Sequence, residues 1–318
     1  MSLMQEWFGT AGTGPSRSAI AITYSAPATN QVINIPTLPG YVAGKTDLTV
    51  TINSGVYVYA TSIANSGLSL TGGKAAGDTV TVVNNGYIAG QGGNGANVNQ
   101  PSGNPGGPAF SISSPIILTN NSYIGGGGGG GGGTVPATSA TGGGGGAGGG
   151  NGAPAGYPSH PASIYVGSGG AGGYAGSAGT PGAPIPTPSG TFTNPAGQGG
   201  GAGGGSGALQ PIGRGSTALA GGGGGGSIFP GTGGSGGTPQ PGFPTSSYPA
   251  SAGGAGNSVG SGGATYASGG GGGWGAAGGV GYASPCLSMP GGTGGKAINL
   301  NGNTITYPAL GTIWGAVS

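Results

Sequence analysis

The side chains that could do acid–base, nucleophilic or metal chemistry are few in this chain. Its 318 residues hold three carboxylates, Glu6, Asp47 and Asp78, with one histidine, His160, and one cysteine, Cys286. Paired acid–base sites, catalytic triads and metal cages each need several such groups held close together. This set cannot readily build any of them. We therefore expect no enzyme activity, no metal site and no cofactor.

Phosphate-binding and nucleic-acid-binding signatures are also missing from the sequence. A P-loop needs Gly, four residues, then Gly-Lys followed by Ser or Thr. Around Lys296 the first position is Pro290, and the residue after the lysine is Ala297. The formal net charge of +2 provides no basic patch for nucleic acid. We expect no nucleotide and no nucleic-acid partner.

Opposite charges lie close together at two places in the first part of the chain. Lys45 is near Asp47, and Lys74 is near Asp78. We expect these to be exposed charges of a folded domain, with a role in docking to a partner as the alternative.

Glycine dominates the rest of the chain, supplying 90 of its 318 residues, and proline adds 26. Nine consecutive glycines occupy 125–133, and similar runs recur to the end of the sequence. Such a composition is typical of low-complexity disorder. However, only 3% of the residues are charged and mean hydropathy is +0.03, whereas disordered chains usually stay apart through charge. An ordered structure that consumes the backbone amides internally is therefore favoured.

Polyproline-II helices provide such a structure when they are made of glycine. They have three residues per turn, and their N–H and C=O groups point sideways without internal partners. Only glycine fits where these helices crowd together, so we expect a sandwich of packed polyglycine-II helices with almost no α-helix. The glycines expected to be structural are Gly125, Gly129, Gly133, Gly144, Gly203, Gly223 and Gly271.

The chain is predicted to divide into three parts: 1–18, 19–90 and 91–318. Alternating β-branched and polar residues predict strands in the second part, which we interpret as an all-β domain. The third part is the predicted glycine sandwich, and Asn301-Gly302 near its end predicts a β-hairpin. The strands expected within 19–90 lie at 19–24, 31–35, 48–52, 56–59 and 79–83, and further strands are expected at 109–118, 297–300 and 304–307.

Segments between the glycine runs are rich in Pro, Ser, Thr and aromatic residues, the composition that binding loops favour. If neighbouring helices run antiparallel, successive loops leave at opposite ends, so 153–166, 208–219, 238–251 and 282–290 would share one end. Tyr and Trp are favoured at interface hot spots. The candidates for binding are Tyr157, His160, Tyr165, Phe192, Phe229, Phe243, Tyr248, Tyr266, Trp274 and Tyr282. For His160, an ordinary solvent-facing position is the alternative.

Four stretches, 90–95, 106–110, 118–124 and 142–146, carry a resemblance in both order and content. Together they resemble the adhesin at the tip of the long tail fibres of T-even-type bacteriophages. The resemblance implies a polyglycine-II sandwich whose variable loops bind outer-membrane proteins, such as porins, of Gram-negative hosts. It also implies a tail-fibre protein as partner.

Trp7-Phe8 is similar to the aromatic-rich attachment region of that family, so 1–18 is a candidate fibre-docking segment. Local packing of the two aromatic side chains is the alternative. Neither a signal peptide nor an apolar stretch of about 20 residues is visible, so we expect synthesis in the host cytoplasm, a place in the virion and no membrane insertion. The receptor is left open between a porin, another outer-membrane protein and a glycan.

Three other functions compete with receptor binding: a glycine-rich structural material, an ice-binding protein and a fibre-assembly chaperone. The first two predict short, regular turns between the glycine helices. The long, irregular loops of this sequence favour recognition instead. A chaperone would assist fibre assembly without contacting the host, and the sequence does not exclude it.

Overall fold

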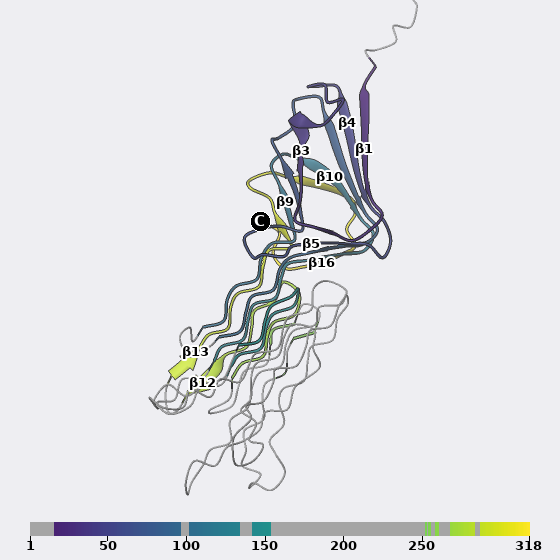
Figure 1. Cartoon of the computed structure of the whole chain (residues 1–318). Helices are drawn as coiled ribbons and strands as arrows, with labels where there is room; N and C mark the ends of the chain where they lie inside the picture. Colours follow the sequence, from purple (N-terminus) through teal and green to yellow (C-terminus); the bar gives the residue numbers. More distant parts are fainter. Residues whose placement is uncertain are drawn as a thin grey trace, which may run out of the picture.

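The computed structural model describes residues 16–96, 102–133, 142–153, 252, 254–255, 258–260, 268–283 and 287–318. Apart from one short 3-10 helix, η1 (Ile35–Thr37), the described elements are strands and extended segments. The described chain forms a β-rich body and a bundle of glycine segments that runs away from it (Figure 1).

The β-rich body is built from three sheets in which every pair of neighbouring strands is parallel. The first sheet contains β1 (Ser18–Tyr24), β4 (Thr46–Ile52), β7 (Thr79–Asn84), β10 (Ile116–Asn120) and β15 (Ile305–Ala309). The second contains β2 (Ala28–Thr29), β5 (Tyr57–Tyr59), β8 (Tyr87–Ala89), β11 (Tyr123–Gly125) and β16 (Thr312–Trp314). The third contains β3 (Gln31–Asn34), β6 (Leu68–Thr71), β9 (Phe110–Ile112) and β14 (Ile298–Asn299).

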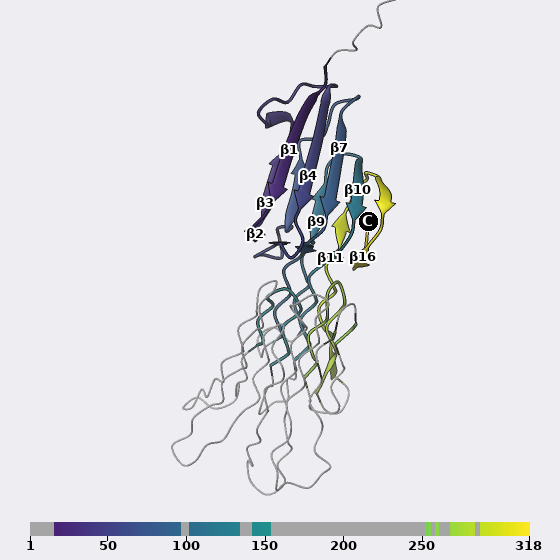
Figure 2. The same cartoon turned by 90° about the vertical axis from the view of Figure 1, so that its right-hand side faces the viewer.

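Chain order makes this body a three-sided parallel β-helix. Each coil visits the first, second and third sheets in turn, then begins the next coil beside the strand it started from. The view in Figure 2 shows β1, β4, β7 and β10 side by side along one face. The fifth coil closes the body, where Val317 forms a bridge with Ile298.

Alternation of side chains along each strand fills the interior of the β-helix. In β4 every second residue is buried, and the inward side chains Leu48, Val50 and Ile52 are at most 1% exposed. In register, Leu48 lies beside Val80 of β7, so apolar residues stack from coil to coil. One core cluster contains buried apolar residues from all three sheets.

Two buried asparagines extend this stacking at a corner of the β-helix. Asn84 and Asn120 are paired in register, and Asn84 Nδ2 donates to Asn120 Oδ1 at 2.7 Å. Asn120 Nδ2 in turn donates to the carbonyl of Leu310 at 2.8 Å. These amides satisfy each other where the backbone turns between the first and second sheets.

Asp78 is buried, which corrects the expectation that it would be an exposed charge. Its carboxylate accepts hydrogen bonds from Tyr41 Oη (2.8 Å), Thr46 N (2.9 Å) and Ala75 N (3.0 Å). Burial alone raises the pKa of Asp78, but these hydrogen bonds outweigh it, so the pKa lies below its ordinary value. Asp47, by contrast, is partly exposed and pairs with Arg17, with Nε and Oδ2 2.5 Å apart.

The strands predicted within 19–90 are present, but the sheets do not stop at residue 90. Strands β9, β10, β11, β14, β15 and β16 belong to the same three sheets and come from the part of the chain predicted to be glycine sandwich. The predicted hairpin around Asn301-Gly302 is wrong. Both residues have positive φ and form a turn, but β14 and β15 on either side of it pair in different sheets.

The glycine segments are insertions into the β-helix, all made at the corner between the second and third sheets. The second coil crosses this corner with residues 60–67, the third with 90–109 and the fourth with 126–297. Glycine segments from the third and fourth coils therefore start side by side and leave the β-helix in the same direction (Figures 1 and 2).

Candidate functional site

The segment Gly126–Gly132 lies at the centre of the described glycine bundle and donates hydrogen bonds to three neighbours. From Gly127 to Gly132 the N–H groups donate to 102–108, 142–150 and 275–281 in strict rotation, at N···O distances of 2.7–2.9 Å, while Gly126 N donates to the carbonyl of Trp314 in β16. The donor–acceptor pairs are Gly127 to Gly107, Gly128 to Ala147, Gly129 to Ala276, Gly130 to Asn104, Gly131 to Gly144 and Gly132 to Gly279.

Carbonyl groups of the same segment accept hydrogen bonds from three further neighbours, 291–297, 90–96 and 268–273. The donor–acceptor pairs are Gly295 to Gly127, Gly93 to Gly128, Gly272 to Gly129, Gly292 to Gly130, Ala96 to Gly131 and Gly269 to Gly132. The central segment is thus surrounded by six others, and its partners repeat every third residue. This period matches the three residues per turn of a polyproline-II helix.

Side chains are excluded from this central segment by its neighbours. A Cβ atom added at Gly129 would fall far inside van der Waals contact with the carbonyl oxygen of Gly292, and one at Gly271 with that of Gly145. At Gly129 the clash is with backbone, which cannot move aside without breaking the hydrogen bonds just described. A side chain at Gly129 or Gly271 would therefore require backbone to move. The structural role expected for these glycines stays a prediction, and Gly203 and Gly223 lie outside the described residues.

The two ends of the bundle differ in how the chain turns. At the end nearest the β-helix the described turns are short: Ala147-Gly148-Gly149, and Trp274-Gly275, where Gly275 packs against Gly315. Gly148, Gly149 and Gly275 have positive φ, which only glycine adopts without strain. At the far end the chain reverses through β12 (Gly281–Ala283) and β13 (Leu287–Met289), which pair antiparallel (Figure 1).

Described residues that flank the long intervening segments share the far end. Gly133 follows Gly132 there, Gly143 donates to Ala96, Ala153 donates to Gly143, and Gly269 donates to Gly132. This corrects the expectation that successive loops leave at opposite ends. The short turns beside the β-helix return the chain, so the flanks of 134–141 and of 154–267 come out on the same side as 282–290.

Trp274 is fully buried, so it is not available for a receptor, and its prediction as a binding residue is wrong. It lies in a cluster with Ala89 of β8 and Ala147 of the neighbouring glycine turn. Glycine segments leave no side chains of their own to fill the space against the β-helix. A large apolar side chain at this turn fills that space and joins the two parts of the molecule.

A row of aromatic side chains on the second sheet packs against this cluster. Tyr57 and Tyr87 are stacked with ring centroids 4.3 Å apart, Tyr87 and Tyr123 are 5.9 Å apart, and Trp314 is 5.2 Å from Tyr123. This row is not among the residues predicted from the sequence. Its signal is one tyrosine recurring in each short β-strand after a turn, which becomes visible only once the parallel register of β5, β8 and β11 is known.

The remaining predicted site residues are not brought together by the described structure. Tyr282 is in β12, opposite Ser288 of β13 at the far end of the bundle. The other binding and docking candidates lie outside the described residues: Trp7, Phe8, Tyr157, His160, Tyr165, Phe192, Phe229, Phe243, Tyr248 and Tyr266. Among the residues that the structure places, no cluster of three His, Cys, Asp or Glu side chains could hold a metal.

The family model of the phage tail fibre adhesin Gp38 matches residues 19–216. The chain belongs to the Gp38 phage tail fibre adhesin family. No curated protein matches the chain.

A solved structure shares the fold of this Gp38-family adhesin. The crystal structure of the gp37-gp38 adhesin tip complex of the bacteriophage S16 long tail fiber matches with a TM-score of 0.50 and 19% identity. The match covers 94% of this chain and 82% of that chain. Because the chain belongs to the Gp38 family, it is a component of the phage tail fibre with a role in host recognition, and the expected resemblance is confirmed. Within the described residues, no helix has the length and apolarity to cross a membrane.

Proposed function

We propose that this adhesin binds a receptor on the host outer membrane through the segments that depart from the far end of its glycine bundle, and that it acts by binding alone. The observation that carries the proposal is the shared direction of those departures. Five described flanks, at 96, 133, 153, 268 and 283, leave on one side, opposite the short turns beside the β-helix. A rigid scaffold that presents irregular segments at one end is a common arrangement for recognition.

A rigid glycine bundle supports the proposal that the departing segments bind the receptor while the bundle holds them in place. In the central segment every N–H from Gly126 to Gly132 donates to a neighbouring segment or to the β-helix, so sequence changes in the departing segments need not disturb it. Tyr157, His160, Tyr165, Phe192, Phe229, Phe243, Tyr248, Tyr266 and Tyr282 remain the candidate receptor contacts, because rigid aromatic side chains contribute most to interface affinity. An outer-membrane protein such as a porin is the receptor we favour.

Exchange of the departing segments tests the proposal. Segments 134–141, 154–166 and 238–251 are replaced by those of a relative with a different host, and adsorption to both hosts is measured. We expect host preference to follow the segments. The control exchanges the β-helix corner 38–44, which lies outside the bundle, and should leave adsorption unchanged. Host preference that stays the same after exchange of all three segments would refute the proposal.

The opposite end of the molecule is the proposed docking site for the tail-fibre protein. Strands β1, β2 and β3 form the first coil, and among the described strands each lies at the outer edge of its sheet, a position that favours association with another chain. Val32 on β3 is 65% exposed at this edge. Trp7 and Phe8 precede β1 in the chain, so their insertion into the fibre would anchor this end.

Replacing both aromatics tests the docking site. The double variant Trp7→Ala and Phe8→Ala should lose co-purification with the tail-fibre protein while keeping the melting temperature of the wild type. A double variant at the other end, Phe243→Ala and Tyr248→Ala, serves as control and should still co-purify. Equal recovery of both double variants with the fibre would remove the aromatic pair from the docking site.

A further inference from the structure

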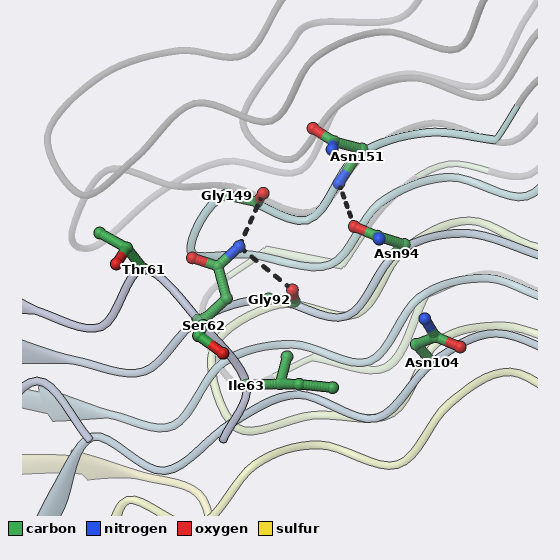
Figure 3. Close-up of a pocket in the computed structure, with 9 residues that line it drawn as sticks. Thr61, Ser62, Ile63, Gly92, Asn94, Asn104, Gly149 and Asn151 are labelled. Carbon is green, nitrogen blue, oxygen red and sulfur yellow. Dashed lines mark hydrogen bonds between the residues drawn. The ribbon is translucent and has the colours of Figure 1, made fainter. Parts of the chain in front are cut away.

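A half-open pocket of about 250 Å³ lies where the glycine bundle meets the β-helix. On one side it is bounded by the corner of the second coil, Thr61, Ser62 and Ile63, and on the other by residues of the glycine segments, including Asn94 and Asn151 (Figure 3). None of these residues belongs to the far end, where receptor binding is proposed. The pocket is therefore a separate feature.

Gln91 gives the pocket an unused hydrogen-bond acceptor. Its side-chain Nε2 donates to the carbonyl oxygens of Gly149 (2.9 Å) and Gly92 (3.4 Å), which fixes the orientation of the amide because those two oxygens can only accept. Its Oε1 atom is buried and has no hydrogen-bond partner, and the residue as a whole is 8% exposed. A buried acceptor without a donor is unfavourable, so a ligand that donates a hydrogen bond to it would be favoured.

Other lining groups add complementary chemistry. Asn94 Oδ1 accepts from Asn151 N at 3.0 Å, which leaves the Asn94 Nδ2 group as a donor at the exposed rim. Ser62 Oγ accepts from Ala64 N, so its hydroxyl hydrogen can be donated. Ile63 is 41% exposed and supplies an apolar wall. No charged side chain is among the described residues that line the pocket.

We infer that this pocket binds a neutral saccharide ring of a surface glycan. Sugar hydroxyls donate and accept hydrogen bonds at once, which suits an acceptor at Gln91 beside donors at Asn94 and Ser62. The C–H face of a sugar is apolar and fits against Ile63. A pocket lined without charges gives no counter-ion to phosphate, carboxylate or ammonium groups. Pockets for drug-sized ligands have volumes of about 300–1,000 Å³. The volume of this pocket is smaller, which suits a single sugar ring.

Such a site would let the adhesin bind surface glycans weakly, without using the segments at the far end of the bundle. Few hydrogen bonds and one small apolar wall imply a dissociation constant of about 1–10 mM for a single ring. The inference does not depend on the receptor proposal, since neither the residues nor the end of the molecule is shared.

Titration of the full chain with methyl glycosides tests the inference. The panel contains the methyl glycosides of glucose, galactose, mannose and N-acetylglucosamine, and binding is followed by saturation-transfer NMR. We expect saturable binding of at least one glycoside. Asn94→Asp keeps the acceptor for Asn151 N but replaces the amide donor, and should weaken binding about tenfold, the effect of one hydrogen bond. Ile63→Asp, at an exposed site, should weaken it similarly.

Asn65→Asp is the matched control, because it introduces the same charge in the same corner at an exposed residue that does not line the pocket. It should bind like the wild type, and thermal melting of all three variants shows whether they are folded. The inference would be overturned if no glycoside bound saturably at concentrations up to about 50 mM, which is 50-fold above about 1 mM. Equal binding of the glycoside by folded Asn94→Asp and folded Asn65→Asp would also overturn it. Glycoside titration does not report host preference, so its failure is distinct from failure of the receptor proposal.

Discussion

Single atoms decide which residue can occupy the centre of the glycine bundle. At Gly129 a methyl group would meet the carbonyl oxygen of Gly292, itself held in the hydrogen-bonded lattice. Room for the methyl group requires two segments to separate, with loss of several backbone hydrogen bonds worth about 0.5–1.5 kcal/mol each.

The variant Gly129→Ala is expected to lose about 3 kcal/mol or more of unfolding free energy, measured by urea denaturation. Gly302→Ala is the matched control. Nothing lies within 4 Å of a Cβ atom there, so only its positive φ opposes alanine, at a cost of about 1–2 kcal/mol. A smaller loss for Gly129→Ala than for Gly302→Ala would contradict the packing described for the bundle.

Asp78 makes stability depend on pH through a single buried carboxylate. Its hydrogen bonds from Tyr41, Thr46 and Ala75 lower its pKa in the folded protein despite the opposing effect of burial. A carboxylate with a lowered folded pKa stabilises the fold above its unfolded pKa of about 3.9, and this contribution is lost as pH falls through the folded value.

We therefore expect Asp78→Asn to be less stable than the wild type at pH 7, with a gap that narrows as the pH falls from 5 to 2. Urea midpoints of both proteins across that range provide the measurement. Comparison of the two chains cancels the contributions of Glu6 and Asp47. A gap that stays constant with pH would show that the Asp78 charge has no part in stability.

At the scale of elements, the junction between β-helix and bundle depends on Trp274. Its side chain is fully buried against Ala89 and Ala147, next to the aromatic row from Tyr57 to Trp314. Truncation to alanine removes this side chain and leaves a cavity between the β-helix and the bundle. Losses of about 3–5 kcal/mol are typical for such a change.

Trp274→Ala is thus expected to lower the unfolding free energy by about that amount, with adsorption retained by the protein that remains folded. Tyr266→Ala, outside the described residues and a candidate receptor contact, should show the opposite pattern of normal stability and weakened adsorption. Loss of adsorption by fully folded Trp274→Ala would restore Trp274 as a receptor contact.

The sequence predicts local features of these elements better than their connections. Alternation in 48–52 and 79–83 predicts strands correctly, because inward and outward residues differ in polarity. It does not reveal parallel coils, since one coil can be joined to the next at any distance, here across the 126–297 insertion. Asn301-Gly302 has the residues of a tight turn but connects strands of different sheets, so its local signal predicts the turn and not the pairing.

For the candidate site, too, the sequence predicts local features better than the way in which the segments are connected. Runs of glycine predict the bundle because only glycine permits six close neighbours, and the period of three in the hydrogen bonds follows from the helix type. The end at which the chain departs depends on the short turns at 147–149 and 274–275, and neither stretch has a sequence pattern that predicts a turn toward the β-helix. Trp274, the largest side chain in that region, is predicted to bind because Tyr and Trp are favoured at interface hot spots, and the sequence does not distinguish an exposed tryptophan from a buried one.

At the scale of the whole molecule, two kinds of order are combined in one chain. The β-helix is stabilised by a conventional apolar core drawn from all three sheets. The bundle has almost no side chains at its centre and is held by backbone hydrogen bonds that cross between distant segments. Insertion at one corner of the β-helix places the starts of these segments together, which reduces the entropy cost of assembling them.

Those crossing hydrogen bonds hold the bundle together, and amide hydrogen exchange of the purified full chain measures them directly. Residues Gly126–Gly132 each donate to another segment or to the β-helix, so we predict exchange at least 1,000-fold slower than for an unstructured glycine chain, matching the core strands β4 and β7. Exchange of these seven amides at the rate of an unstructured chain, while β4 and β7 stay protected, would contradict the hydrogen-bonded bundle and the rigid scaffold inferred from it.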